Sequence, residues 1–390
     1  MNLAERYLLL GLRLGRLQEG LVDGYYGPED LQALAQSGDP ADPHELRTEA
    51  AELGSEIEAS DLEPGRRAWL VSQVGALECV AELLAGEEVD WRRKVRRCYG
   101  IDVDVTPEER FERVHGQLDA ALPGGGDLAS RLERWNDSQQ IPPEKLLDAF
   151  TLLTEELREA TRGLVELPVG EEIEIRLVSN EPWSAYNWYL GGRRSRIDVN
   201  TDLPVHAHRL AHLVAHEGYP GHHTEHVCKE AQLVDELGWP EASILLIHTP
   251  ECVVSEGIAQ IALDQALGSD WAERVAAILG TLGLAFDPQV AAVVYAADTT
   301  LEDVAVNVSY FASELGWSTE ELVAYQQRWT LANEERAAKR VAFATHPFWG
   351  AYTPTYPVGL RLAQAYAARA PGNFRRLLTE ELVPAELAAA

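Results

Sequence analysis

The most constraining feature of this chain is a histidine-rich segment with a proline and a glycine at its centre. Seven of the eleven histidines lie between His206 and His226, and the middle of the segment reads HEGYPGHH from His216 to His223. Neutral histidine is the commonest protein ligand of transition metals. Glu217 stands directly beside one of these histidines. Imidazoles that hold an ion, with a carboxylate that takes a proton from water, are the components of a zinc hydrolase site.

The spacing of these histidines predicts a distorted helix. In the short zinc motif HExxH the two ligands lie four residues apart on one helical face, but here that position is Pro220. The next histidine, His222, follows His216 by six residues, which would rise about 9 Å in a straight helix and point to another face. A proline ring clashes with the carbonyl four residues earlier, and Gly221 permits unusual backbone angles. We therefore expect a widened turn that returns His222 to the side of His216.

Other ligand choices are open at this point. His223 is the alternative to His222. It follows His216 by seven residues, about two helical turns, so both side chains would lie on the same face of the helix. In a regular helix, however, the side chains of His216 and His223 would be about 10 Å apart. His212 and His216 have helical spacing and could form a metal-ligand pair, but this choice assigns Glu217 no clear role. The alternative without a metal is a helix whose histidines hydrogen-bond within a polar cleft. The density of histidines beside a glutamate favours the metal site.

The third ligand is expected farther along the chain, because catalytic zinc usually has three protein ligands and one open position. The segment PECVVSEGIA, residues 250–259, offers Glu251, Cys252 and Glu256. Glu256 is favoured because it lies in a mostly apolar run, where a carboxylate needs a partner. Gly257 behind it lets a second helix approach closely. A cysteine in this position is more often a buried structural thiol than a ligand.

Composition limits the class of protein. The chain has 390 residues, 46% of them hydrophobic, and a formal net charge of -30. The hydrophobic content predicts a substantial core, and the negative charge argues against nucleic acid or an anionic membrane as a partner. The four cysteines do not form CxxC pairs or suggest a disulfide framework, which favours a cytoplasmic location. No stretch reads as a transmembrane segment.

The order of patterns along the chain predicts a mainly α fold. Residues 1–165 read as an N-terminal helical half, interrupted by glycine and proline clusters. Within the catalytic half, 166–390, polar and apolar residues alternate at about 173–200, which predicts a small antiparallel sheet. The metal-binding helix follows at about 204–236, and C-terminal helices follow it, with a loop at 345–357. We expect one integrated domain with the sheet beside the metal helix and a central cleft between the halves.

These motifs resemble the DUF885 family, which has the signature His-Glu-x-x-Pro-Gly-His-His followed by Glu-Gly-Trp-Ala. The second motif reads Glu-Gly-Ile-Ala here, from Glu256 to Ala259, and Glu225 stands where the family usually has glutamine. The family is similar to the gluzincin metallopeptidases, including the thermostable carboxypeptidase family and, more distantly, angiotensin-converting enzyme.

The resemblance implies roles for individual residues. His216, His222 and Glu256 would bind zinc, and Glu217 would be the general base. In the distant converting-enzyme relatives, a C-terminal segment brings a histidine and then a tyrosine to the zinc to stabilise the oxyanion. His346 and Tyr356 have a similar separation here and are the corresponding candidates.

The sequence therefore predicts a zinc-dependent hydrolase of a peptide or related amide bond, with carboxypeptidase-like or oligopeptidase activity. The predicted strand at 195–200 could pair with an extended substrate. Arg193, Arg194 or Arg361 could hold a terminal carboxylate. The same motif would suit a metallohydrolase of a non-peptide amide or ester, and a non-catalytic metal-binding helical protein is a further alternative.

Overall fold

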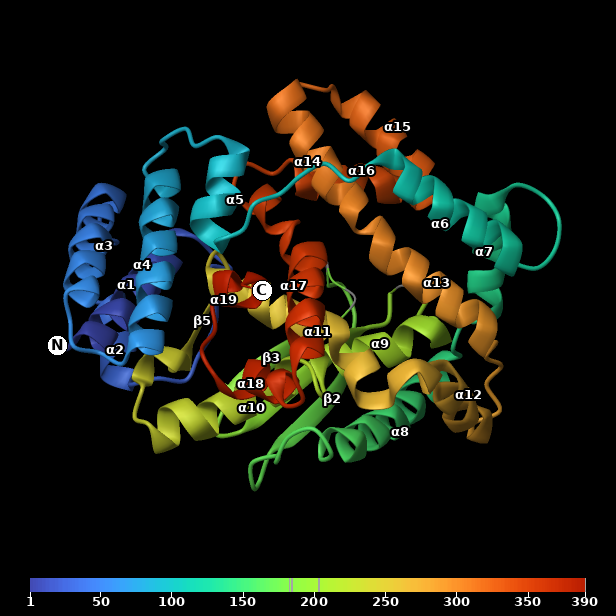
Figure 1. Ribbon diagram of the computed structural model, residues 1–390, viewed down its shortest axis with the longest axis horizontal. Helices are drawn as coiled ribbons and strands as arrows, with labels where there is room; N and C mark the ends of the chain where they lie inside the picture. Colours follow the sequence, from blue (N-terminus) through green and yellow to red (C-terminus); the bar gives the residue numbers. More distant parts are fainter. Residues whose placement is uncertain (182, 184, 203, 390) are drawn as a thin grey trace.

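The computed structural model describes residues 1–181, 183, 185–202 and 204–389. Helices dominate, with two small sheets among them (Figure 1), which confirms the predicted mainly α fold. Among the described residues, no helix combines the length and the apolar character needed to span a bilayer.

The N-terminal helices stand together at one side of the molecule (Figure 1). They are α1 (Leu3–Leu17), α2 (Glu29–Gln36), α3 (Pro43–Glu58), α4 (Pro64–Leu84) and α5 (Trp91–Tyr99). Their apolar faces form one core cluster, which also takes in Val253, Val306 and Val358 from much later in the chain. A short strand, β1 (Val22–Tyr25), pairs antiparallel with β5 (Ile244–Leu246). The N-terminal segment is thus packed directly against the elements that follow the histidine cluster.

A second core cluster is formed by the buried faces of a further set of helices. These helices are α6 (Glu108–Ala121), α7 (Leu128–Ser138), α8 (Pro143–Thr161), α12 (Trp271–Thr281), α13 (Pro288–Leu301), α14 (Asp303–Leu315), α15 (Thr319–Thr330) and α16 (Glu334–Ala344). The cluster joins Phe150 of α8 with Val214 of the histidine-bearing helix and Val304 of α14. It therefore holds one face of that helix in the interior.

The larger sheet differs in one respect from the prediction. Its strands are β2 (Glu172–Val178), β3 (Ala185–Gly191) and β4 (Arg194–Asn200), in the order β2-β4-β3. β4 pairs antiparallel with β3 and parallel with β2, so the sheet is mixed and not purely antiparallel. The reason is that β4 inserts between the two earlier strands after the turn that follows β3. Because β4 is hydrogen-bonded on both sides, the predicted pairing of 195–200 with a substrate strand is wrong.

The chain ends with a run of helices around α11 (Pro250–Leu267). The others are η2 (Pro240–Ser243), η3 (Gly268–Asp270), η4 (Trp349–Tyr352), α17 (Thr355–Arg369), α18 (Asn373–Thr379) and α19 (Pro384–Ala388). The predicted loop at 345–357 is therefore partly helical. Pro357 does not prevent this, because a proline in the first turn of a helix removes no intrahelical hydrogen bond. In the centre of Figure 1, α17 lies beside α11.

Candidate metal centre

The predicted metal helix is divided at the proline-glycine pair. α9 (Ala207–Glu217) ends before it, and α10 (His222–Lys229) begins after it and runs into the π-helix η1 (Glu230–Glu236). In the link, the Gly221 amide donates to the carbonyl of Ala215, six residues earlier, at 2.9 Å. A Cβ on Gly221 would lie 2.0 Å from the carbonyl oxygen of His216, so only glycine fits. The turn is widened as predicted, to the point of a complete break.

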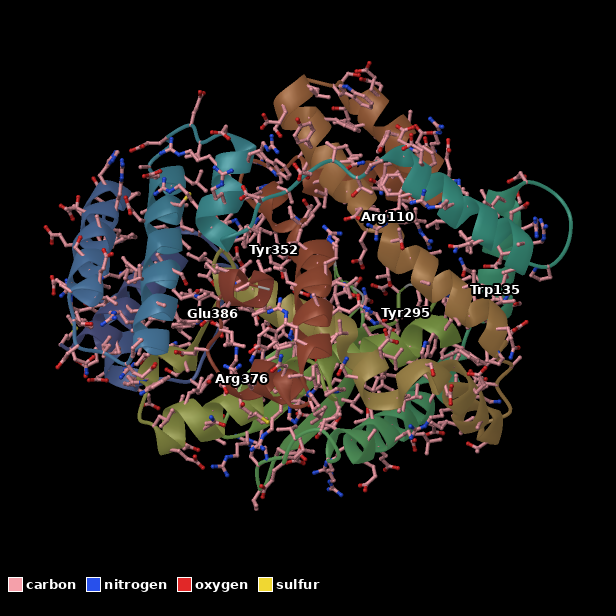
Figure 2. All side chains as sticks on the ribbon, viewed as in Figure 1. Arg110, Trp135, Tyr295, Tyr352, Arg376 and Glu386 are labelled. Carbon is pink, nitrogen blue, oxygen red and sulfur yellow. The ribbon has the colours of Figure 1, made fainter. Side chains whose placement is uncertain are left out.

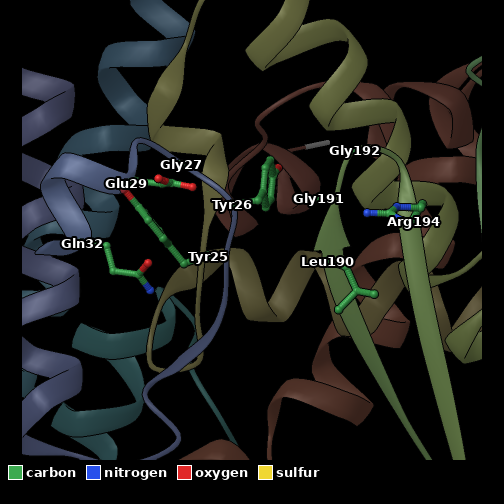
Figure 3. A pocket seen from close by; sticks show the side chains of 9 residues that line it. All are labelled: Tyr25, Tyr26, Gly27, Glu29, Gln32, Leu190, Gly191, Gly192 and Arg194. Carbon is green, nitrogen blue, oxygen red and sulfur yellow. The ribbon is translucent and has the colours of Figure 1, made fainter.

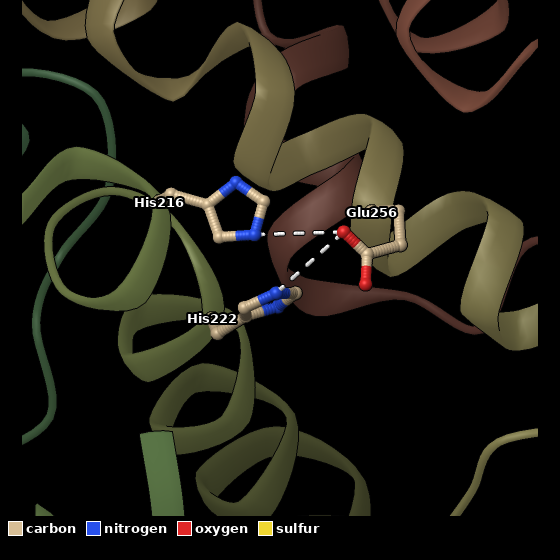
Figure 4. Close-up of side chains that lie close together, drawn as sticks. All are labelled: His216, His222 and Glu256. Carbon is tan, nitrogen blue, oxygen red and sulfur yellow. Dashed lines mark ion pairs between the residues drawn. The ribbon is translucent and has the colours of Figure 1, made fainter. Parts of the chain in front are cut away.

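This break places two imidazoles side by side. The ring centroids of His216 and His222 are 4.8 Å apart, with the rings nearly perpendicular. The Nε2 atoms of His216 and His222 lie 3.5 Å and 4.0 Å from Oε2 of Glu256 (Figure 4). One ligand atom from each residue falls within 4.8 Å of the others. The structure thus brings together the three side chains that the sequence singled out as metal ligands.

The third side chain reaches the pair because α11 and α17 cross closely. A Cβ on Gly257 would lie 2.5 Å from the carbonyl oxygen of Gly359, and a Cβ on Gly359 would lie 2.4 Å from that of Val253. Glycine at both positions lets the two helix backbones touch. The contact fixes the turn of α11 that carries Glu256.

The donor atoms are suited to a cation. Glu256 is only 6% exposed, and its Oε2 has no hydrogen-bond partner among the described residues. Its Oε1 accepts a hydrogen bond from the Tyr352 hydroxyl at 2.5 Å. Burial raises the pKa of Glu256 to about 8, the Tyr352 hydrogen bond opposes this, and the Glu217 charge adds to it. A buried carboxylate oxygen without a partner is costly, and a metal ion held with two imidazoles would satisfy it.

His223, the rival second ligand, is engaged elsewhere. It is fully buried, its Nδ1 lies 2.8 Å from Ser195 Oγ, and its Nε2 lies 3.0 Å from Glu171 Oε2. Tyr219 and Arg158 donate to the same Glu171 carboxylate. Both nitrogens of His223 are therefore used in a buried network that ties α10 to the sheet.

The other candidates for the third ligand are also occupied. Glu251 forms an ion pair with Lys229 at 3.2 Å, and the thiol of Cys252 donates to the carbonyl oxygen of Leu246 at 3.2 Å. Glu256 is thus the member of this helix whose carboxylate faces the histidines.

Glu217 lies at the end of α9, directly before the break, and is 8% exposed. Asn187 of β3 donates its Nδ2 to the Glu217 backbone carbonyl at 2.5 Å, which anchors this end of the helix to the sheet. Burial raises the pKa of Glu217 to about 8, and the nearby Asp23 charge adds to this. Among the described residues, no Lys or Arg forms an ion pair with Glu217 within 4.0 Å.

Asp23 on β1 is a residue of this region that sequence reasoning missed. It accepts a hydrogen bond from the Tyr186 hydroxyl of β3, and burial raises its pKa to about 7. Its charge acts on both Glu217 and Glu256. No motif surrounds it, and it stands far from the histidines in the sequence, so only the pairing of β1 with β5 reveals its place.

The two residues proposed for the oxyanion lie in different surroundings. Tyr356, in the first turn of α17, packs edge-on against Tyr352 with ring centroids 5.5 Å apart. Burial raises the pKa of Tyr356, and the charge of Glu256 adds to the increase, so its hydroxyl stays protonated. Figure 2 shows Tyr352 near the start of α17. The sequence did not single out this second tyrosine, because its role depends on its contact with Glu256, which is distant in the chain.

His346 is exposed and does not contact the three clustered side chains. Its Nδ1 accepts hydrogen bonds from the backbone amides of Phe348 at 3.2 Å and Trp349 at 3.0 Å. The imidazole therefore caps the turn before η4, because these amides at a helix start have no other partner. The structure does not support an oxyanion role for His346.

The predicted carboxylate-binding arginines are spread over the surface. Arg193 pairs with Asp235 at 2.8 Å, and Arg361 pairs with Asp303 at 2.9 Å. Arg194 lines a shallow hollow of about 330 Å³ at the turn between β3 and β4, opposite Tyr26 (Figure 3). None of the three forms an ion pair with the clustered residues, as far as the structure describes the chain.

Comparison with known proteins adds evidence for the fold. No protein-family model matches the chain, and no curated protein matches it. A candidate lipoprotein from Colwellia psychrerythraea has a similar structure, with a TM-score of 0.58 and 15% identity over 89% of this chain and 66% of that one. A candidate lipoprotein of unknown function from Shewanella oneidensis gives a TM-score of 0.51 and 13% identity over 92% and 74%.

A more distant structure is the M32 carboxypeptidase from Deinococcus radiodurans R1. Its TM-score is 0.36, with 14% identity over 97% of this chain and 88% of that chain. The resemblance to the DUF885 family stays a prediction, because no family model matches.

These neighbours correct the predicted cytoplasmic location. The two neighbours from Colwellia psychrerythraea and Shewanella oneidensis are candidate lipoproteins, a class found in the cell envelope, which argues against the cytoplasm. The prediction depended on the cysteines, all four of which are free in the structure. Free thiols exclude a disulfide framework, but they do not by themselves determine the compartment.

Proposed function

We propose that this chain is a zinc-dependent hydrolase of peptide or related amide bonds, with His216, His222 and Glu256 as the metal ligands. One observation carries the proposal. Three elements, α9, α10 and α11, direct two imidazole nitrogens and one buried carboxylate oxygen without a hydrogen-bond partner to a common point. Two histidines and a glutamate are the ligand set of one well-known class of catalytic zinc site.

Zinc bound by these three residues would supply a Lewis acid that polarises the scissile carbonyl and lowers the pKa of a water molecule. Glu217 would accept a proton from the attacking water and deliver it to the leaving amine. Its position supports this role, because it directly follows the ligand His216 and its carboxylate has no cationic partner among the described residues. The low exposure of Glu217 keeps bulk water from competing for that proton.

Tyr356 is the residue we propose for oxyanion stabilisation. A hydroxyl that donates a hydrogen bond to the developing negative charge lowers the barrier of acyl transfer. Tyr356 packs against Tyr352, whose hydroxyl donates to the ligand Glu256, and this contact supports its position beside the reacting groups. Tyr352, in contrast, already donates to Glu256 and would hold that ligand in place.

The experiment that tests this function combines metal analysis with a peptide-library assay of the purified protein. The wild type should retain about one zinc per chain and cleave peptides. Glu217→Gln should retain zinc and lose most activity, because the base is removed and the ligands are kept. His346→Ala is the matched control and should behave as wild type. A fully active Glu217→Gln variant, or a wild type that binds no zinc, would overturn the proposal.

A further inference from the structure

The second metal-ligand candidate, His222, is hydrogen-bonded to a chain of polar side chains that ends at a buried ion pair. Its Nδ1 lies 3.1 Å from the hydroxyl oxygen of Ser255 on α11. The Ser255 hydroxyl donates to Oε2 of Glu225 at 2.6 Å. The other oxygen of Glu225 accepts from Lys229 at 2.6 Å. Glu225 and Lys229 are 1% and 4% exposed, while Ser255 and His222 are partly buried.

The ion pair at its far end determines the direction of every hydrogen bond. Lys229 also donates to Glu251 at 3.2 Å, so two carboxylates share one ammonium group. An ionised carboxylate only accepts hydrogen bonds, and a serine hydroxyl has a single hydrogen to donate. Ser255 uses that hydrogen on Glu225, so its oxygen can only accept from His222. The proton of the imidazole is therefore on Nδ1.

This tautomer leaves the other ring nitrogen available. The Nε2 of His222 then carries the lone pair, and it is the nitrogen that lies 4.0 Å from Oε2 of Glu256. An amide at position 225 would not impose this order, because it can both donate and accept. Glutamine there could donate to Ser255, which would then donate to His222 and place the proton on Nε2.

We propose that Ser255, Glu225 and Lys229 form a relay that fixes the tautomer of His222, which makes Glu225 and Ser255 positioning residues of the metal centre. The value of the relay for metal binding depends on the function proposed above. The predicted tautomer of His222 does not depend on that function, because the hydrogen bonds of the relay form without a metal. Partners of this kind typically change metal affinity by about 10- to 100-fold when removed.

The first test is the tautomer of His222 in the metal-free protein, measured by NMR with ¹⁵N-labelled histidine. The wild type should show His222 protonated at Nδ1. Glu225→Gln should shift the population toward protonation at Nε2, and Ser255→Thr, which keeps the hydroxyl, should retain the wild-type pattern. A wild type protonated at Nε2, or a Glu225→Gln variant with an unchanged tautomer, would overturn the relay.

The second test is zinc affinity, measured by competition with a chelator. Ser255→Ala and Glu225→Gln should each weaken zinc binding by about 10- to 100-fold. Ser309→Ala is the matched control, because this buried serine bonds to Ala344 and Thr353 instead. Wild-type affinity in both relay variants would overturn the positioning role. If the wild type itself binds no zinc, the proposed function fails, while the tautomer measurement still decides whether the relay exists.

Discussion

At the scale of single residues, Gly221 connects the sequence motif to the metal geometry. Any larger residue would place a Cβ 2.0 Å from the His216 carbonyl oxygen, far closer than two non-bonded atoms can approach. A backbone atom cannot rotate away as a flexible side chain can. The link between α9 and α10 would have to open, and His222 would move away from His216.

We therefore expect Gly221→Ala to destabilise the protein by about 3 kcal/mol or more and to weaken zinc binding together with stability. Denaturant unfolding and chelator competition measure the two effects. Gly75→Ala is the matched control, because a Cβ there meets no atom within 4 Å and alanine favours the helix. The control should be neutral or stabilising by up to about 1 kcal/mol. Equal stability of the two variants would contradict this account of the break.

At the same scale, the sequence was informative where chemistry and spacing coincide. His216, His222 and Glu256 were favoured by the histidine spacing around the proline and by the apolar run around Glu256, and the DUF885 resemblance implied the same three residues. Tyr352 and Asp23 were not identifiable, because their roles depend on contacts between segments far apart in the chain. The capping role of His346 was equally hidden, because a histidine near a tyrosine in the sequence does not reveal which backbone amides its ring meets.

At the scale of elements, the crossing of α11 and α17 positions the third ligand. Gly257 and Gly359 bring carbonyl oxygens within 2.5 Å and 2.4 Å of where a Cβ would lie. The sequence predicted a close helix approach at Gly257, but not the partner helix, because the start of α17 reads as a proline-rich loop.

Gly257→Ala should push the two helices apart and cost about 2–3 kcal/mol of the free energy of unfolding. The displaced Glu256 should also lose affinity for zinc, since the ligand set needs all three groups. Thermal or denaturant unfolding measures the first effect and metal titration the second. Gly280→Ala in α12, where a Cβ has open space, serves as the control. A Gly257→Ala variant as stable as this control would show that the crossing is not tight.

In the larger sheet, the residue pattern predicts where the strands lie but not their order. Alternation correctly located strands near 173–200; in β2 partly buried and exposed residues alternate, whereas the second half of β4 is buried on both faces. Strand order is set by which edges meet, and no residue pattern in β2 or β3 specifies that β4 lies between them.

At the scale of the whole molecule, buried neutral histidines make stability depend on pH. His248 is fully buried, with Nδ1 at 3.0 Å from the Tyr99 hydroxyl and Nε2 at 3.0 Å from the Phe348 carbonyl. Burial lowers its pKa from 6.5 to about 4, although the hydrogen bond to Phe348 opposes this. Between these two values the unfolded chain binds a proton that the folded chain does not, so stability falls as the pH falls.

We expect His248 alone to lower the free energy of unfolding by roughly 3 kcal/mol between about pH 6.5 and pH 4. Burial lowers the pKa of His208 to about 2 and that of His226 to about 3, so both act in the same direction. The buried acids Glu217, Glu256 and Asp23, whose pKa values are raised, act in the opposite direction, so the difference between wild type and variant isolates the share of His248. Denaturant unfolding across this range, on wild type and His248→Gln, measures the share of His248. The variant should be less stable at pH 7, and its difference from wild type should shrink toward pH 4. An unchanged slope would contradict the assignment.

The arrangement of the whole chain explains why the site needs both halves. β1 supplies Asp23, the helices around the break supply two imidazoles, and the C-terminal segment supplies the tyrosines and the glycine that admits α11. In the proposed function, these parts converge on one metal ion.

The most direct test is a crystal structure of the zinc-loaded protein with anomalous scattering measured at the zinc absorption edge. We predict one strong peak about 2.0–2.2 Å from Nε2 of His216, Nε2 of His222 and a carboxylate oxygen of Glu256. A peak bound by His223 or His212 in place of His222, or no peak near Glu256, would contradict the account.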